Sequence, residues 1–252
     1  MQSDSLARHA MVRIRRDTHR RAVTVTAVTD ITPRMRRITL AGDELRGFES
    51  SSYDDHVKLL FPLTDADAVS RNITPRRFDP EARTLDVDIA LHDGPIGRWA
   101  GDVAVGSPAW VGGPRGSYVV PMDFDWYLLI GDETALPAIG RRLEELPAGS
   151  RAIVVAEIAD AAEEQAFASR AATEIVWLHR GDATPGTTRN LQDAVAALTL
   201  PPGDGYVWAA CESDAARELR AHLVARGVRR EWLRVSAYWK RDAADVHETL
   251  ND

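Results

Sequence analysis

The pattern of apolar residues changes at about residue 123, and this change limits the chain to a fold with two parts. Before it, short runs alternate apolar and polar residues and are separated by Gly, Pro and Asp; the clearest are residues 23–25, 37–40, 57–60 and 85–91. Strands with one buried face have this period of two, and frequent turn residues between them are typical of an antiparallel barrel. We therefore expect a β-barrel domain over residues 22–122.

After residue 123 the apolar runs become continuous and alternate with helical patterns, which is typical of buried parallel strands and their crossover helices. The expected strands are residues 126–130, 152–156, 174–178, 206–210 and 233–238. The expected helices are residues 136–146, 161–169, 190–198 and 214–226. The pattern predicts an α/β parallel-sheet domain over residues 123–242, and hence a β + α/β fold class for the chain.

Composition excludes several classes of protein. Cys211 is the single cysteine in 252 residues, which rules out an intrachain disulfide, a four-thiolate iron-sulfur cluster and a cysteine-rich zinc site, and favours a reducing cytoplasm. The formal net charge of -7 argues against a general nucleic-acid binder. No apolar run approaches the roughly 20 residues of a membrane span. We expect flexible termini at residues 1–21 and 243–252, and a monomer.

Residues 71–78 collect guanidiniums and a hydroxyl around a proline, directly before the alternating run 85–91. Arg71 is suited to bind a phosphate through its guanidinium, and Thr74 to offer a hydroxyl to a flat ring. Gly94 and Gly97, further on, would let backbone N–H groups approach phosphates closely. These groups suit FAD, although spacing alone leaves open an ordinary polar turn followed by a half-buried strand.

From about residue 22 to residue 242 the chain resembles the siderophore-interacting proteins, the ferric-siderophore reductases of the ferredoxin-NADP reductase superfamily. The segments that carry the resemblance follow one another in order: residues 31–42, 56–62, 71–78, 88–92, 113–117, 131–139 and 238–241. The resemblance implies an N-terminal antiparallel FAD-binding β-barrel and a C-terminal α/β domain that binds NADPH or NADH. It implies cytoplasmic reduction of ferric siderophores with release of Fe(II).

The resemblance also assigns residues to the cofactors. Those expected at FAD are Arg71, Ile73, Thr74, Arg76, Asp88, Ile89, Leu91, His92, Gly94, Ile96, Gly97 and Trp99. Those expected at the nicotinamide nucleotide are Gly131, Asp132, Glu133 and Thr134, in a loop between a strand and a helix where parallel sheets form their ligand crevice. We expect Thr134 to cap that helix.

Two positions depart from the family pattern. Ile73 stands where the family usually has a Tyr beside the flavin, which removes about 0.5 to 1.5 kcal/mol of ring stacking. Cys211 stands where the family commonly has Gly, and its larger side chain would narrow the nicotinamide side of the cleft.

Of the 31 Lys and Arg residues, Lys58 and Lys240 are the two lysines, and both lie in segments that resemble the family. We expect Lys58, Lys240 and Arg241 to bind an anionic ferric siderophore, because an acidic protein needs a local positive patch for such a ligand. Because the cofactors carry the redox chemistry, we expect no catalytic acid, base or nucleophile and no metal ligand. His92 has no second ligand at metal-binding spacing.

Two other readings stay open at this point. The chain is also consistent with a module that binds siderophore or flavin without turnover, and Ile73 is the residue that favours this alternative. A reductase partnered by ferredoxin would need a larger basic docking face than Lys240 and Arg241 supply. The choice between NADPH and NADH stays open as well, because 29 arginines hide any pocket for a 2′-phosphate.

Overall fold

This computed structural model describes residues 8–62, 68–243 and 248–250, and the chain divides into two compact units between Pro121 and Met122. The expected domain boundary lies one residue further on. Each unit has its own sheet and its own core, and they are described in turn.

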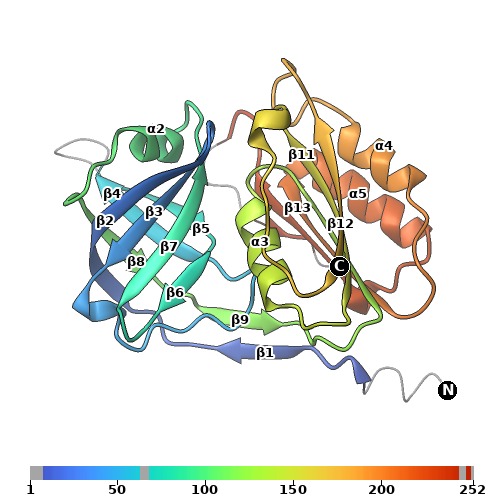
Figure 1. The fold of residues 1–252 in the computed structure, drawn as a ribbon, viewed down its shortest axis with the longest axis horizontal. Helices are drawn as coiled ribbons and strands as arrows, with labels where there is room; N and C mark the ends of the chain where they lie inside the picture. Colours follow the sequence, from blue (N-terminus) through green and yellow to red (C-terminus); the bar gives the residue numbers. More distant parts are fainter. Residues whose placement is uncertain (1–7, 63–67, 244–247, 251–252) are drawn as a thin grey trace. The chain divides into compact units, whose positions relative to one another are not determined.

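The first unit is built on a curled antiparallel sheet with the strand order β5-β4-β8-β2-β3-β7-β6 (Figure 1). Its strands are β2 (Arg20–Thr32), β3 (Met35–Ala41), β4 (Val57–Pro62), β5 (Ala68–Ile73), β6 (Arg77–Asp79), β7 (Thr84–Ala90) and β8 (Pro108–Gly112), with a short 3-10 helix at Asp43–Leu45. The register of β2 against β3 shifts at two places, between Val25 and Ala27 and between Asp30 and Thr32. Such irregularities bend a strand, and they let the long β2 follow the curl. The expected antiparallel barrel architecture is confirmed.

The alternating residues of these strands point inward and form the core of the first unit, with Val25, Ile38, Leu40, Leu59 and Val87 fully buried. The expected strand patterns are therefore right, because the period of two in the sequence corresponds to one buried face.

The basic N-terminal segment is partly a strand rather than a flexible leader. β1 (Val12–Arg15) pairs antiparallel with β9 (Gly116–Val119), and Arg16 donates to the hydroxyls of Ser51 at 2.6 Å and Ser117 at 2.7 Å. The expectation of flexible residues 1–21 is wrong for this part, because backbone pairing and these hydrogen bonds hold it. Residues 1–7 lie outside the described part of the chain.

The second unit is a sheet with the order β12-β11-β10-β13-β14-β15, parallel except for the last pair (Figure 1). Its strands are β10 (Trp126–Gly131), β11 (Arg151–Ile158), β12 (Ala172–His179), β13 (Gly205–Glu212), β14 (Leu233–Trp239) and β15 (Glu248–Thr249). Its helices are α3 (Leu136–Glu145), α4 (Asn190–Ala197) and α5 (Ser213–Ala225), with 3-10 turns at Ala161–Glu163 and Arg230–Trp232. Leu191 of α4 and Leu219 of α5 share a core with Leu128 of β10, whereas α3 lies on the other face of the sheet. The expected α/β domain is confirmed.

Two expectations about the second unit are wrong. Residues 161–169 form a single 3-10 turn and then continue without regular secondary structure, because Glu164 binds His179 of β12 at 2.9 Å and Ser169 donates to the carbonyl of Leu143 at 2.8 Å. Tertiary contacts here override the helical propensity of the segment. At the C-terminus, Glu248–Thr249 pairs with β14 and is not loose, while residues 244–247 and 251–252 lie outside the described part.

Candidate functional site

Arg71 and Ile73 lie on strand β5, where the sequence predicts a turn. In the pairing of β4 with β5, Arg71 stands opposite Leu59 and Ile73 opposite Val57, so both point to the side of the sheet that holds the core. Ile73 packs against that core, and the guanidinium of Arg71 donates to the carbonyl of Ser70 at 2.7 Å. The turn is confined to residues 74–76, where Thr74 is buried.

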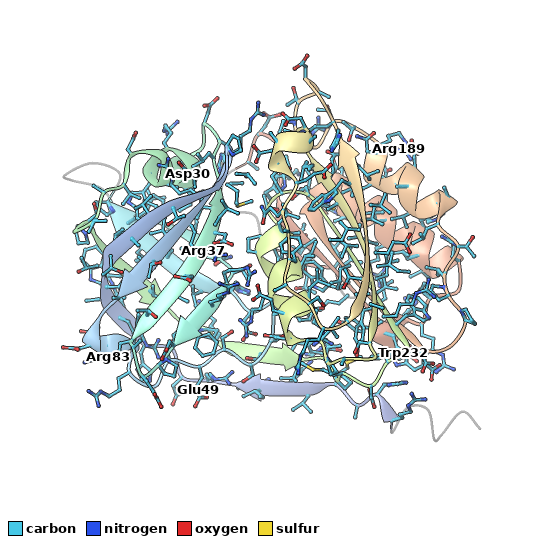
Figure 2. All side chains as sticks on the ribbon, in the orientation of Figure 1. Asp30, Arg37, Glu49, Arg83, Arg189 and Trp232 are labelled. Atoms are coloured by element: carbon cyan, nitrogen blue, oxygen red, sulfur yellow. The ribbon has the colours of Figure 1, made fainter. Side chains whose placement is uncertain are left out.

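Asp88 and Arg76, both expected at FAD, are engaged with each other. Arg37 of β3 donates to both carboxylate oxygens of Asp88 at 2.7 Å, and the Nε of Arg76 lies 3.5 Å from the same carboxylate (Figure 2 labels Arg37). Arg76 and Asp88 have side chains that are 4% and 3% exposed. The ion pairs explain why these charges tolerate burial, and they leave the Asp88 carboxylate committed to the protein.

Residues 92–102 form a turn and the helix α2 (Pro95–Asp102), which the sequence analysis did not predict. His92 accepts the N–H of Gly94 at its Nδ1 over 2.9 Å. A Cβ on Gly97 would lie 2.5 Å from the backbone nitrogen of His92 and closer still to its carbonyl oxygen. The packing of α2 against the turn at His92 therefore requires a glycine at position 97, independently of any contact that Gly97 makes with a ligand.

Four further residues of the expected FAD set also have places within the protein. Ile89, Ile96 and Trp99 belong to the core, where Trp99 stacks on Phe61 with ring centroids 4.9 Å apart. Leu91 packs against the same core and donates its N–H to the carbonyl of Arg34 at 2.8 Å. Their side chains face inward, so a ligand at the surface would meet their backbone.

The first unit nevertheless has features that fit FAD. Among the residues that the structure describes, no side chain caps the N-terminus of α2, so the N–H groups of Ile96 and Gly97 lack acceptors within the helix. Helix N-termini of this kind bind phosphate. The Oδ1 of Asn72, between Arg71 and Ile73, is buried without a hydrogen-bond partner in the described part of the chain. A phosphate and a ring with N–H donors would satisfy these groups.

In the second unit, the loop after β10 is held by its own carboxylate. Asp132 accepts the N–H of Thr134 at 2.9 Å and its hydroxyl at 2.5 Å. The expectation that Thr134 caps α3 is therefore wrong: the residue before that helix is Ala135, and no side chain in the described part of the chain caps the helix. Gly131 is also required sterically, because a Cβ there would lie 2.6 Å from the carbonyl oxygen of Ala210.

The carboxyl ends of the parallel strands gather several acidic groups that the sequence analysis did not connect. Glu133 forms a two-point ion pair with Arg180, at 2.7 and 2.9 Å, and Glu157 of β11 accepts the hydroxyl of Thr188. Burial raises the pKa of Glu157. The sequence could have indicated the Glu133–Arg180 pair, since Arg180 directly follows β12 and Glu133 follows β10, so both lie at the carboxyl ends of parallel strands.

Asp132 and Cys211, at this edge, have strongly shifted pKa values. The burial of Asp132, and next the charge of Glu133, raise its pKa to about 7, although hydrogen bonds from Thr134 and Trp239 oppose the shift. Burial also raises the pKa of the Cys211 thiol, with Asp132 and Glu212 adding to the effect. Cys211 faces the core that contains α4 and α5.

The three cations expected at the siderophore lie in different units. Lys58 is half-buried on β4, opposite Asn72 and Gly112. Lys240 and Arg241 follow β14 directly and are exposed.

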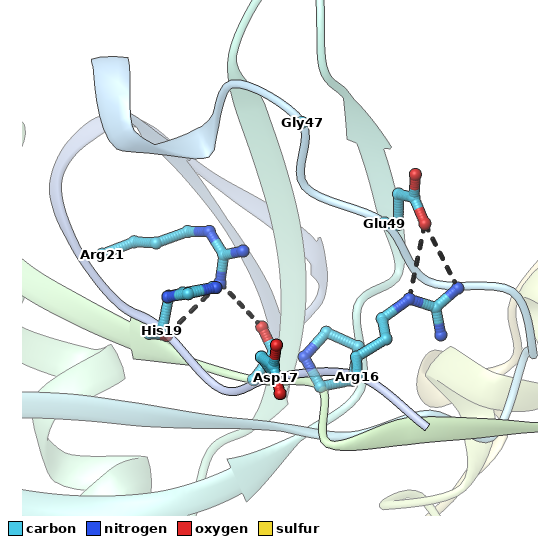
Figure 3. A pocket seen from close by; sticks show the side chains of 8 residues that line it. Arg16, Asp17, His19, Arg21, Gly47 and Glu49 are labelled. Atoms are coloured by element: carbon cyan, nitrogen blue, oxygen red, sulfur yellow. Dashed lines mark hydrogen bonds and ion pairs between the residues drawn. The ribbon is translucent and has the colours of Figure 1, made fainter. Parts of the chain in front are cut away.

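A hollow of about 280 Å³ in the first unit is lined by Arg16, Asp17, His19, Arg21, Gly47, Glu49, Gly113 and Pro114 (Figure 3). Arg16 turns to Glu49 at 3.4 Å, and Arg21 donates to the carbonyls of His19 and Gly113. The guanidiniums are thus already bound to acceptors of the protein.

No helix in the described part of the chain combines the length and the apolar character needed to cross a membrane.

Comparison with known proteins gives a family match for each of the two units. The family model of the siderophore-interacting FAD-binding domain matches residues 24–70 and 63–118, and that of the siderophore-interacting protein matches residues 124–242. A protein of Escherichia coli (strain K12) named NADPH-dependent ferric-chelate reductase is 30% identical over 249 residues, which cover 90% of this chain and 95% of the relative. The chain belongs to the siderophore-interacting protein family.

Solved structures agree with this membership. A siderophore utilization protein from T. fusca is 38% identical, with a TM-score of 0.89, and the match covers 94% of this chain and 98% of that one. The siderophore-interacting protein SipS from Aeromonas hydrophila is 27% identical, with a TM-score of 0.77 and coverage of 91% and 93%. In this siderophore-interacting protein, the FAD-binding match falls in the first unit and the other match in the second.

Proposed function

We propose that this siderophore-interacting protein is an FAD-dependent ferric-siderophore reductase that takes electrons from NADPH or NADH. The observation that carries the proposal is that each of the two family matches falls within one folded unit. Relatives named as ferric-chelate and ferric vibriobactin reductases support it. Because Cys211 is the single cysteine and is a free thiol, the proposal places the protein in a reducing compartment such as the cytoplasm. The proposal also takes the protein to be a monomer.

The residues of the first unit would hold FAD. The N-terminus of α2 would receive the pyrophosphate at the N–H groups of Ile96 and Gly97, and Arg71 would pair with a phosphate oxygen. Thr74, buried at the turn after β5, would present its hydroxyl to the ring. Bound FAD supplies the redox chemistry, since it accepts hydride from a nicotinamide and releases electrons singly to a metal.

The second unit would supply the nicotinamide nucleotide site at the carboxyl ends of β10 and β13, with Gly131, Glu133 and Thr134 at its rim. Lys240 and Arg241, exposed beyond β14, would attract the ferric chelate by their charge, against a formal net charge of -7 for the chain. These side chains orient and attract, and none of them needs to donate or accept a proton.

An anaerobic titration tests the proposal. The purified protein should show flavin absorbance, bleach with NADPH or NADH, and regain its colour with a ferric siderophore while a ferrous-specific chelator reports Fe(II). A colourless protein that does not take up added FAD at micromolar concentration would refute the proposal. A protein that binds the chelate but transfers no electrons to it would be a binding module.

A paired substitution tests the cations. Lys240→Ala with Arg241→Ala should raise the KM for an anionic ferric chelate and leave flavin content unchanged. Arg151→Ala with Arg170→Ala removes two exposed cations at the amino ends of β11 and β12 and is the matched control. If both pairs change the KM equally, net charge and not a local site attracts the chelate.

A further inference from the structure

The segment that carries Lys240 and Arg241 is held at two points by buried carboxylates. The indole N–H of Trp239 donates to Oδ2 of Asp132 at 2.8 Å. Two residues further on, the backbone N–H of Arg241 donates to Oε1 of Glu212 at 3.3 Å. The two exposed cations thus extend from a backbone that is fixed on both sides of Lys240.

Asp132 is well placed as an anchor because it joins three strands of the sheet. Its Oδ1 binds Thr134 in its own loop after β10, and its Oδ2 binds both Trp239 at the end of β14 and the N–H of Glu212 at the end of β13, the latter at 3.2 Å. The residue is 5% exposed. A carboxylate with this many N–H and O–H donors is rigid and needs no external cation.

Glu212 is fixed as firmly as Asp132. Its Oε2 accepts the N–H groups of Asp214 at 2.7 Å and Ala215 at 3.3 Å, so it caps the first turn of α5. Its other carboxylate oxygen is the one that holds Arg241.

The loop after β12 closes over both anchoring contacts. A Cβ on Gly186 would lie 2.8 Å from Cγ of Glu212 and 2.9 Å from Cη2 of Trp239, and this glycine has a φ of +72°. A side chain at position 186 would therefore displace the Trp239 ring. The close approach keeps the ring in the orientation that reaches Asp132.

We propose that Asp132 and Glu212 are positioning residues for the ferric chelate, because together they fix the Trp239–Lys240–Arg241 segment and pre-organise its two cations. This role rests on the proposed function, which assigns Lys240 and Arg241 to the chelate. Fixing the backbone beforehand lowers the entropy lost when an exposed lysine and arginine bind an anion. Asp132 thereby acts on the chelate through Trp239. In this proposal its main role is to hold Trp239, and the expected contact with the nicotinamide nucleotide is secondary.

Several charged groups surround this anchor and determine its response to pH. Glu133 lies next to Asp132 in its loop and is paired with Arg180. At the end of β13, Glu212 donates its N–H to Asp132, and the charges of Asp132 and Glu212 both act on the Cys211 thiol. Lys240 and Arg241 follow Trp239, the last residue of β14. Burial, and next Glu133, raise the pKa of Asp132 to about 7. Protonation as the pH falls through 7 weakens the acceptor of the Trp239 indole, so the cations lose part of their fixation in acid.

Binding of a redox-inert gallium(III) chelate to the flavin-loaded protein measures the positioning without turnover. Trp239→Phe removes the indole N–H and keeps a ring, and we expect the Kd to rise about 3- to 10-fold, as for loss of one hydrogen bond. Trp232→Phe is the control, since Trp232, labelled in Figure 2, is 5% exposed and its ring packs against Phe124. It should leave the Kd unchanged.

Asp132→Asn tests the anchor itself. It should raise the Kd at pH 8 by a similar factor, have no added effect in the Trp239→Phe background, and abolish the loss of affinity that the wild type shows between pH 8 and pH 6. Taking the ratio of variant to wild type cancels the titration of the chelate. Amide hydrogen exchange at Lys240 and Arg241 should accelerate in this variant.

Two results would overturn the inference in distinguishable ways. In the first, the wild type binds the gallium chelate tightly and the variants have the same Kd, or the effects of Trp239→Phe and Asp132→Asn on the Kd add in the double variant. That result would contradict the positioning role of Asp132 and leave the proposed function intact. A flavin-loaded wild type that binds no chelate at any pH would remove the proposed function, and with it the role of this segment.

Discussion

Arg37 donates from Nε and Nη2 to the two carboxylate oxygens of Asp88, each over 2.7 Å. The pair crosses from β3 to β7, where the two residues stand directly opposite each other. With Arg76 beside it, the Asp88 carboxylate holds two guanidiniums at the edge of the FAD-binding unit. A residue that resemblance assigned to the cofactor therefore stabilises the frame that carries Thr74 and Arg76.

Asp88→Asn should lower the free energy of unfolding by about 3 kcal/mol, because it leaves buried guanidinium charge without its counterion. Urea denaturation measures this change. Asp43→Asn is the control, since its partner Arg83 and Asp43 itself are exposed, and loss of such a surface pair costs less than about 1 kcal/mol. Equal losses in the two variants would contradict a structural role for Asp88.

Two glycines of α2 should respond in opposite directions to the same substitution. Gly97→Ala places a Cβ against the backbone of His92 and should destabilise the protein by about 1 to 3 kcal/mol. Gly101→Ala, one turn later, meets nothing within 4 Å and should be neutral or stabilising by up to about 1 kcal/mol. Thermal unfolding compares the two, and a harmless Gly97→Ala would show that α2 can shift.

Arg71→Ala should weaken FAD binding about 10- to 100-fold, as expected for loss of a charge-assisted hydrogen bond. Titration of the apoprotein with FAD, followed by flavin fluorescence, measures the Kd. Arg77→Ala is the control because Arg77 is exposed on β6, the strand that follows β5 in the sequence. Unchanged affinity after Arg71→Ala would remove this residue from the phosphate site.

Ile73→Tyr should tighten FAD binding by up to about tenfold, because an aromatic ring adds about 0.5 to 1.5 kcal/mol of stacking. Ile73 packs against the core of its unit, so the larger ring must turn outward to gain this contact. The melting temperature of the apoprotein is the control for crowding. An identical Kd and an identical flavin potential would show that a ring at position 73 is dispensable.

The raised pKa of Asp132 also predicts how stability depends on pH. A carboxyl whose folded pKa is about 7, against 3.8 as the ordinary value, binds its proton more tightly when folded. Stability from this group is therefore present below about pH 4 and is lost as the pH rises to about 7. The difference in unfolding free energy between the wild type and Asp132→Asn should therefore fall between pH 5 and pH 7 and then level off. A difference that grows with pH would contradict the raised pKa of Asp132.

How much the sequence determined is clearest at the strands. Residues 85–91 alternate with a period of two, and the structure pairs Thr84–Ala90 with its apolar side inward. The continuous runs after residue 123 are likewise parallel strands, because a strand covered on both faces has no polar side to show. Local pattern suffices for such features, since the period of burial is set by backbone geometry.

Tertiary structure decided which side chains meet. Nothing in the spacing of Asp132, Glu212 and Trp239 predicts one hydrogen-bonded group, because these residues are brought together by the order β10-β13-β14 in the sheet. The same holds for Arg37, Arg76 and Asp88, because the Asp88 carboxylate meets both guanidiniums inside the first unit. Hydrogen bonds and ion pairs require two groups to lie within a few ångströms of each other. Residues far apart in the chain come this close only when the strands that carry them pair.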